Sequence, residues 1–408
     1  MNATITPDWI TKNAARILVN NLQFASNINR QYDDQFVQAG AKVGMTVKAR
    51  LPQRFRTTKG QALQVQNTTD TYVPVSLTDQ ANVGMSFSSQ EMTTDVDDFR
   101  ERYIKPAAEQ LANTIDFDGL ARCYQEVWNA VGTPAVTPTS NLTYLQAGVK
   151  LTNGAAPIES RTAVLDPLSN ATLSNANFTL FNPQGAIGGM WRSGRMTATN
   201  ALGVQKWFED QNVARHTSGA YTTATPEVNG ANQTGSSLIT DGWASGASNL
   251  TKGDVFTVEG VFAVNPQNYS STGALQQFVV TAPISDTTGA MTISISPAIV
   301  TSGAYQTVTN SPADNADVFV IGATTALTST VSSQSLIFHK DAFTMVMADL
   351  VMPNGGARAS RYSNNELGVA LRLAEQWNAQ TDQNVTRLDC LYGFKTIRPE
   401  LACRIYGA

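Results

Sequence analysis

The residues best suited to acid–base or metal chemistry near neutral pH are the two histidines, His216 and His339. Neither lies at the spacing from a cysteine, a histidine or a carboxylate that a metal site uses. Either could in principle join a Ser-His-Asp triad, yet the sequence has no Gly-x-Ser-x-Gly motif to present a nucleophilic serine. We therefore predict no catalytic residue, no metal site and no enzymatic activity.

Two other segments are similar to ligand-binding loops but lack the required residues. Gly185–Gly189 is rich in glycine, without the Lys-Ser/Thr pair of a phosphate-binding loop or the spacing of a dinucleotide loop. Asp95, Asp97 and Asp98 are spaced like calcium ligands, but an aromatic and a basic residue follow where glycine and further oxygen ligands belong. We expect these carboxylates to stabilise the start of a helix, and we predict no cofactor.

The composition describes a chain with a largely uncharged polar surface. Of the 408 residues 15% are charged, against about 25% in typical domains, and the formal net charge is −4. Such a charge gives no field strong enough to gather nucleic acid phosphates or an anionic membrane. Hydroxyls and amides pair again across an interface at a lower cost than charges do, so this surface is suited to burial against other proteins.

Cysteines and apolar runs indicate a soluble protein made in the cytoplasm. Cys123, Cys390 and Cys403 form no CxxC pair and no dense framework, so we expect reduced, buried packing residues. Polar residues interrupt the first apolar stretch, so no signal peptide is expected. No run approaches the roughly 18 apolar residues of a membrane span.

Two helices are predicted in the N-terminal third of the chain. Residues 7–24 carry an apolar stripe at helical spacing, and Lys12 and Arg16 lie elsewhere on the cylinder. This helix either packs on its own domain or reaches a partner. Residues 95–131 predict a long helix with a kink or break near Pro106 and Gly119, where residues 116–118 could begin a second segment.

Between these helices, the chain alternates in strand fashion over residues 42–56 and 71–87 around a polar tip. This pattern predicts a long hairpin. Its basic side chains form either a solvated loop or a finger that lies across an acidic patch of another subunit. These basic residues are Arg50, Arg54, Arg56 and Lys59.

The middle of the chain changes character. Residues 217–330 lose nearly all charge and helical periodicity, and short strands separated by turn residues predict a small barrel or sandwich. The predicted strands are Val255–Val264, Phe278–Thr281, Met291–Ile295 and Val318–Ile321. Mixed α/β character precedes this block, with a strand at Thr162–Leu165 and a helix starting at Asn182-Pro183. It returns afterwards with a strand over Glu366–Ala374, so the β unit is predicted to be an insertion.

Four segments carry further information when they are taken in order. They are Trp207–His216 (WFEDQNVARH), Lys252–Val261 (KGDVFTVEGV), Arg387–Gly393 (RLDCLYG) and Arg398–Glu400 (RPE). Together they resemble tailed-phage major capsid proteins of the Hong Kong 97-like fold. They are similar to the podovirus subgroup related to the Salmonella phage coat protein, in which a β-barrel is inserted into the capsid fold.

The resemblance implies an α+β fold with six segments. They are an N-terminal arm at 1–40, an E-loop with its flanking strands at 41–90, the spine helix of a peripheral domain at 91–139, an axial domain at 140–216 and 332–365, an inserted β-barrel at 217–331, and peripheral-domain strands at 366–408.

The resemblance also implies a major capsid protein that assembles into an icosahedral shell around phage double-stranded DNA. The implied partners are other copies of the chain in hexamers and pentamers, a scaffolding protein, a portal protein and DNA contacted only non-specifically, with no membrane. Lys12 and Arg16 are then contacts for scaffold or a neighbour, and the hairpin arginines are contacts between subunits. The location is the virion capsid. Two alternatives stay open: a secreted or virion-surface β-rich binding protein, and an unrecognised hydrolase.

Overall fold

In a computed structural model, the protein folds into two compact units. One contains residues 1–50, 72–119 and 343–397, and the other contains residues 51–71, 120–342 and 398–408. The residues that the structure describes are 7–30, 46–57, 59–61, 65–66, 70–88, 103–178, 192–196, 200–222, 224–246, 248–286, 288–323, 326–353, 358–364 and 369–408.

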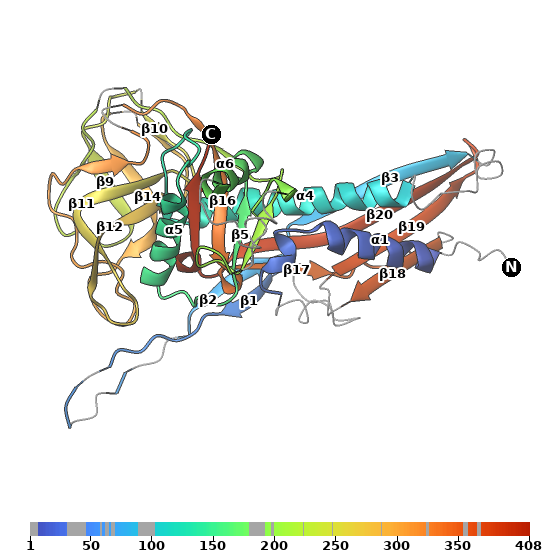
Figure 1. Cartoon of the computed structure of the whole chain (residues 1–408), viewed down its shortest axis with the longest axis horizontal. Coiled ribbons are helices and arrows are strands. Elements are labelled where there is room, and N and C mark those ends of the chain that lie inside the picture. The colour runs from blue at the N-terminus through green and yellow to red at the C-terminus, as the bar shows by residue number, and fades with distance from the viewer. Residues whose placement is uncertain are drawn as a thin grey trace. The chain divides into compact units, whose positions relative to one another are not determined.

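The first unit is built on a five-stranded antiparallel sheet (Figure 1). Its longest strand, β20 (Gln383–Thr396), pairs with three of the other four strands. In the strand at Val369–Asn378, Leu371 and Leu373 are buried and alternate with the partly exposed Arg372. The predicted strand near 366–374 is therefore confirmed from residue 369 onward. The other strands are β3 (Asp79–Ser88), β17 (Phe343–Ala348), β18 (Arg358–Asn364) and β19 (Val369–Asn378).

The predicted N-terminal helix is present as α1 (Pro7–Asn21). Ala14, Leu18 and Leu22 are buried, while Lys12 and Arg16 are exposed. The helix contacts β18 and β19, so its apolar stripe packs on the sheet of its own unit. Of the two alternatives for this helix, packing on its own domain is the one observed.

The long helix α4 (Lys105–Cys123) differs from its prediction. It runs without interruption through Gly119, so the expected break and second segment there are wrong. Pro106 lies in the first turn, where its missing N–H has no helical partner to lose. Residues 95–102 and the three aspartates among them lie outside the described residues.

Two residues of α4 have roles that the helical pattern did not indicate. The carboxylate of Asp116 accepts the backbone N–H groups of Gln23 at 2.6 Å, Phe24 at 3.2 Å and Ala25 at 2.9 Å. It therefore fixes the chain where the short 3-10 helix η1 (Ala25–Asn27) begins. At Gly119 an added Cβ would lie 2.9 Å from the ring of Phe394, so the missing side chain allows the sheet to approach the helix.

The second unit contains a six-stranded sheet, in which five strands follow the order β4-β21-β16-β5-β6 and β7 (Arg215–Thr217) also pairs with β16. The predicted strand at Thr162–Leu165 is confirmed as β5 (Arg161–Leu165), and it is buried at every position. The sequence reasoning gave no helix for α5 (Asn141–Asn153) or α6 (Pro167–Phe178), and Asn182-Pro183 lies outside the described residues. The remaining strands are β4 (Ala130–Val131), β6 (Lys206–Glu209), β16 (Val331–His339) and β21 (Ala402–Tyr406).

The same unit holds a six-stranded antiparallel sheet that closes on itself. Its strand order is β15-β11-β12-β14-β9-β8. The ends meet because Val228 donates its N–H to Ala316 and Asn315 donates to Val228, both at 2.9 Å, directly before β15. We call this closed sheet the barrel. Its strands are β8 (Glu227–Val228), β9 (Gly235–Asp241), β11 (Val255–Val264), β12 (Ser271–Val280), β14 (Met291–Ile299) and β15 (Val318–Val320).

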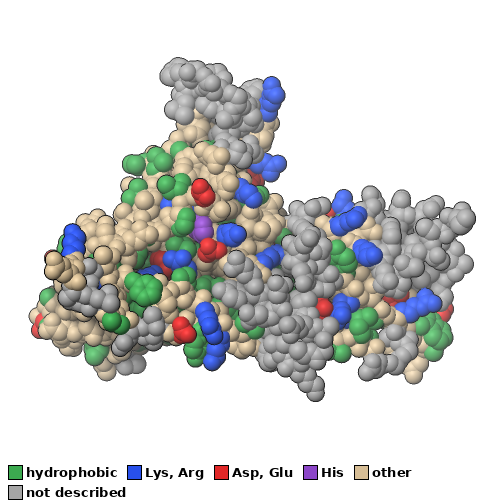
Figure 2. All heavy atoms as spheres, turned by 90° about the horizontal axis from the view of Figure 1, so that it is seen from below, with side chains coloured by type: hydrophobic (Ala, Val, Ile, Leu, Met, Phe, Trp, Pro, Cys, Tyr) green, Lys and Arg blue, Asp and Glu red, His purple; other side chains and the backbone are tan. Residues whose placement is uncertain are grey.

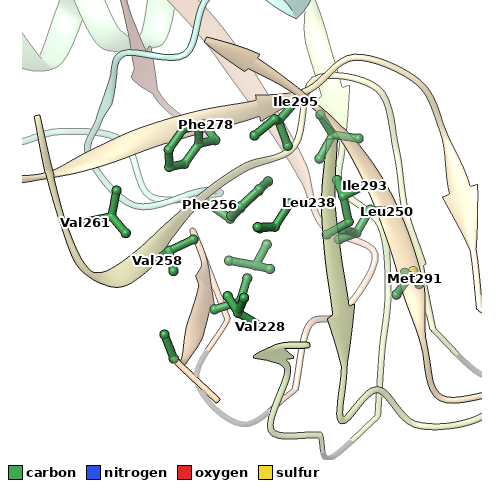
Figure 3. Close-up of a cluster of buried hydrophobic side chains, with 14 of the residues drawn as sticks. Val228, Leu238, Leu250, Phe256, Val258, Val261, Phe278, Met291, Ile293 and Ile295 are labelled. Atoms are coloured by element: carbon green, nitrogen blue, oxygen red, sulfur yellow. The ribbon is translucent and has the colours of Figure 1, made fainter. Parts of the chain in front are cut away.

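The barrel has its own apolar core (Figure 3). In β14 the side chains of Met291, Ile293 and Ile295 are buried and alternate with exposed Thr292 and Ser294. This is the period of two that the sequence predicted, and all four predicted strands are present. A separate two-stranded ladder joins β10 (Asn249–Leu250) to β13 (Ile284–Ser285).

The predicted hairpin is shorter than the alternation suggested. Its paired arms are β1 (Thr46–Arg50) and β2 (Tyr72–Ser76), and residues 42–45 lie outside the described part of the chain. The second predicted arm divides after β2, because β3 pairs with β20 instead of with the first arm. We call residues 51–71 the hairpin loop.

Candidate functional site

The basic residues of the hairpin have two different environments. Arg50, at the end of β1, and Lys59, in the hairpin loop, are exposed. Arg54 and Arg56 instead contact the barrel and the C-terminal segment of their own unit. The four basic residues therefore do not share one environment.

Arg54 has an acidic partner within its own chain. Its Nη2 lies 2.9 Å from Oε1 of Glu400, which also accepts from Nε of Arg398 at 3.1 Å. The guanidinium of Arg54 lies 5.9 Å from the ring centre of Tyr305. Glu400 and Arg398 both belong to the RPE segment, so this segment holds a residue of the hairpin loop.

Arg56 contacts the barrel at Tyr269. Its guanidinium lies 5.3 Å from the ring centre, a distance typical of a cation–π contact. The hydroxyl of Tyr269 lies 3.2 Å from the carbonyl oxygen of Phe55 and 3.2 Å from that of Ala304. Because a hydroxyl has one proton, it donates to one of these oxygens at a time.

A groove of about 400 Å³ borders this contact. Its walls come from α5 and from the β11–β12 hairpin, and Arg54 and Glu400 also line it. Burial lowers the pKa of Lys150 on the α5 side. Leu142, Leu145 and Val149, three or four residues apart on α5, are 43% to 59% exposed, so this helix presents an apolar stripe to its surroundings. The apolar lining residues include Trp128, Val149, Val264, Pro266, Leu275 and Pro297.

The chain enters and leaves the barrel through neighbouring strands. In the antiparallel pair of β7 (Arg215–Thr217) and β16, Thr217 lies opposite Val331 and His216 lies opposite Ser332. His216 is buried, and its Nε2 lies 2.8 Å from Oδ1 of Asp254. Its Nδ1 lies 3.2 Å from the hydroxyl of Tyr124.

Asp254 ties several backbone groups together at this entry. Its Oδ2 accepts the N–H of Thr251 at 2.7 Å and that of Gly219 at 3.0 Å, while its Oδ1 faces His216. An Asp-His-Tyr arrangement is similar to a catalytic relay, but both ring nitrogens are already used in hydrogen bonds and the group is closed to solvent. The arrangement fixes the loop before β11 to the strand that leads into the barrel.

Arg404 completes this buried group, and nothing in its sequence context indicated a special role. Its side chain is completely buried, and Nη1 donates to the carbonyl of Gly253 at 2.9 Å. The rings of Tyr124 and Tyr406 lie 5.8 Å and 5.9 Å from its guanidinium carbon. We call His216, Asp254, Tyr124 and Arg404 the junction cluster. Its members come from four separate parts of the sequence.

Asp210 and the three cysteines have roles in turn formation and packing. Asp210 is buried, which raises the pKa of its carboxyl, and its Oδ1 accepts the N–H of Asn212 in a local turn. Burial raises the pKa of Cys390 and of Cys403 to about 12. With Cys123 they are buried, which confirms that the cysteines are packing residues. Across the described residues, no three His, Cys, Asp or Glu side chains converge as metal ligands would.

The described part of the chain contains no helix with the length and apolar composition needed to cross a membrane. On the face shown in Figure 2, basic and acidic side chains are scattered among uncharged ones. This pattern agrees with the low content of charged residues.

The fold, with its long antiparallel sheet, the α4 helix and the β1–β2 hairpin, is similar to that of a solved phage protein. A chain of Mycobacterium phage Che8 matches with a TM-score of 0.50 and 13% identity, covering 94% of this chain and 90% of its own. The capsid of Ralstonia phage GP4 matches with a TM-score of 0.43 and 11% identity, covering 95% and 88%. The CUS-3 coat protein I-domain matches at 26% identity with a TM-score of 0.20, covering 25% of this chain and 99% of its own. A search of curated proteins found no match.

The chain belongs to the P22 coat protein (gene protein 5) family, whose model matches residues 9–407. It is therefore a phage major capsid protein that forms the shell of the virion by self-assembly, and its role is structural. The Hong Kong 97-like α+β fold that the sequence predicted is confirmed.

Proposed function

We propose that this protein forms an icosahedral shell of hexamers and pentamers around phage double-stranded DNA, assembled with a scaffolding protein and joined to a portal protein. The observation that carries the proposal is the family match over residues 9–407. A shell repeats many modest contacts, so each subunit needs reach as well as compact units. The hairpin loop is suited to supply that reach.

The proposed division of labour follows the six segments named above. Residues 1–40 would be an arm and 41–90 an E-loop. Residues 91–139 and 366–408 would form a peripheral domain, and 140–216 with 332–365 an axial domain. The barrel at 217–331 would be an inserted domain, and the pairing of β7 with β16 supports this boundary.

The exposed basic residues of the hairpin are proposed to contact a neighbouring subunit. Arg50 and Lys59 are the direct candidates, while Arg54 and Arg56 are held within their own chain in the free subunit. The variant Arg50→Glu with Lys59→Glu should reduce shell yield, because it reverses two charges that face outward. Lys105→Glu, at an exposed position on α4, is the matched control. Unchanged yield in the double variant would remove the hairpin from this role.

Lys12 and Arg16 are proposed contacts for scaffolding protein or a neighbour. Both are exposed on α1, while the opposite side of the helix is buried. Lys12→Glu with Arg16→Glu should weaken co-sedimentation of the subunit with the phage scaffolding protein and leave the melting temperature unchanged. Equal co-sedimentation of variant and wild type would count against this contact.

Packaged DNA is proposed to touch the shell only non-specifically. The net charge of −4 and the mixed charges in Figure 2 support weak contact that is sensitive to salt.

The proposed shell is tested by electron microscopy of particles assembled from the purified chain with scaffolding protein. Closed shells of uniform diameter are expected, and open aggregates only would contradict the proposal.

A further inference from the structure

The contacts of Arg54 and Arg56 belong to one continuous patch. Tyr269 and Tyr305, on two separate loops of the barrel, each lie under one arginine of the hairpin loop. Each tyrosine hydroxyl also lies near an oxygen of that loop, at 3.2 Å from the carbonyl of Phe55 and 3.3 Å from the side-chain oxygen of Gln53. Four consecutive residues, 53–56, therefore touch the barrel or Glu400.

Hydrogen bonds join the two sides of the hairpin loop, so contacts at residues 53–56 also orient the opposite side of the loop. Arg56 donates its N–H to the side chain of Gln66 at 2.9 Å, and the amide of Gln66 donates back to the carbonyl of Arg56. Closer to the base, Gln53 donates to Asp70 at 3.2 Å. These bonds join the two arms beyond the end of the β1–β2 ladder.

Tyr269 is held in an unusual backbone conformation. Its φ is +56°, in the left-handed region that favours glycine and asparagine over bulky side chains. The loop 265–270 fixes this conformation, since Asn265 accepts the N–H of Tyr269 at 2.9 Å and donates its own to Ser270 at 3.0 Å. A tyrosine in a backbone conformation that disfavours bulky side chains indicates that the tyrosine side chain itself is needed at this position.

We propose that Tyr269 and Tyr305 form a docking site on the barrel that holds the hairpin loop of the same chain in the unassembled subunit. Glu400 completes the site by pairing with Arg54. Docking keeps the loop in one orientation and withholds Arg54 and Arg56 from other partners until a neighbouring subunit replaces these contacts. This last consequence rests on the proposed role of the hairpin between subunits, whereas docking itself does not.

The contacts are suited to reversible docking. Arg54 is 29% exposed in its side chain and Arg56 is exposed, so solvent screens both. A cation–π contact at such a site shifts an equilibrium by about two- to fivefold. Two of them, with the hydroxyl contacts, favour the docked loop and still allow it to leave.

The test measures opening of the loop in the free subunit. Trypsin cleaves after Arg54, Arg56 and Lys59 when the loop opens, and mass spectrometry gives the rate at each site. Tyr269→Asn with Tyr305→Ala should raise these rates about tenfold, since both ring contacts are lost. Asparagine suits the φ of position 269, so the barrel should keep its melting temperature. Tyr269→Phe keeps the ring under Arg56 and should give a smaller increase.

The outcomes separate docking from the assembly proposal. Faster cleavage in the double variant supports docking, whether or not shell yield changes, because all four hairpin basic residues are still present. Unchanged cleavage at the three loop sites, with an unchanged melting temperature, overturns docking. The variant Arg50→Glu with Lys59→Glu leaves the docking contacts in place, so its effect on shell yield reports on the assembly role alone.

Discussion

Thr217 and Val331 lie opposite each other on β7 and β16, although the whole barrel separates them in the chain. The chain therefore enters and leaves the barrel through two adjacent strands. Among the described residues, the main apolar cluster of the barrel is formed by residues between these two positions. A unit with one core and neighbouring ends is suited to fold without the rest of the chain.

The first prediction is that a fragment of residues 217–331 unfolds cooperatively. Phe256→Ala in this fragment should lower the free energy of unfolding by about 3–5 kcal/mol, because the ring is fully buried in the barrel core. Phe319→Ala is the control, since that ring is 49% exposed, and it should cost far less. Urea denaturation followed by circular dichroism measures both. A fragment without a cooperative transition, when the full chain has one, would contradict independent folding.

The second prediction concerns the junction cluster. His216→Phe keeps a ring at the site but removes the hydrogen bond to Asp254, leaving Oδ1 of a buried carboxylate unpaired. We expect the free energy of unfolding to fall by about 2–3 kcal/mol. Tyr124→Phe removes one neutral hydroxyl and should cost about 1 kcal/mol. Chemical denaturation of the full chain compares them. If the two variants lost equal stability, the carboxylate would not be the main contributor.

The third prediction uses two glycines of one sheet. At Gly393 in β20 an added Cβ would lie 2.0 Å from the carbonyl oxygen of Ser76, so the backbone must move. Gly393→Ala should cost about 3 kcal/mol or more. At Gly84 in β3 no heavy atom lies within 4 Å of such a Cβ, so Gly84→Ala should change stability by less than about 0.5 kcal/mol. Melting temperatures decide, and similar losses in both variants would argue against the close approach at Gly393.

The fourth prediction is a pH dependence due to His339. Burial, with smaller contributions from Arg398, Lys340 and Arg161, lowers the pKa of this histidine below 6.5, although Asp341 opposes the shift. The unfolded chain therefore takes up this proton at a higher pH than the folded chain. The stability contribution is fully present above pH 6.5 and is lost as the pH falls through the folded pKa.

The check is to measure the melting temperatures of wild type and of His339→Gln from about pH 5 to about pH 7.5, the range in which a histidine titrates. The advantage of wild type should shrink toward the acidic end. A difference between the two proteins that stays constant with pH would contradict the shift.

The sequence predicted the parts of the fold that depend on local pattern. Met291, Ile293 and Ile295 alternate with polar residues, which is sufficient to place β14, and the apolar stripe of α1 is equally regular. The second hairpin arm was less predictable, since alternation indicates a strand without naming its partner. Pairing of β3 with β20 joins residues some 300 positions apart, which no local signal carries.

The environments of the functional residues were harder to predict than the strands, because they depend on residues that are distant in the chain. Lys12 and Arg16 could be placed on the exposed face of α1 because a helix repeats regularly. The environments of Arg54 and Arg56 depend on Glu400 and Tyr269, which are distant in the chain. Arg404 has no sequence signal, because burial of an arginine becomes visible only when β21 and the loop before β11 are brought together.

Electron microscopy of the purified protein, alone and with its scaffolding protein, tests the central claim most directly, with size-exclusion chromatography alongside. A shell-forming coat protein should give closed, uniform particles or curved sheets that elute ahead of the free subunit. A monodisperse monomer or small oligomer under every condition, including with scaffolding protein present, would contradict the claim that this chain builds the virion shell.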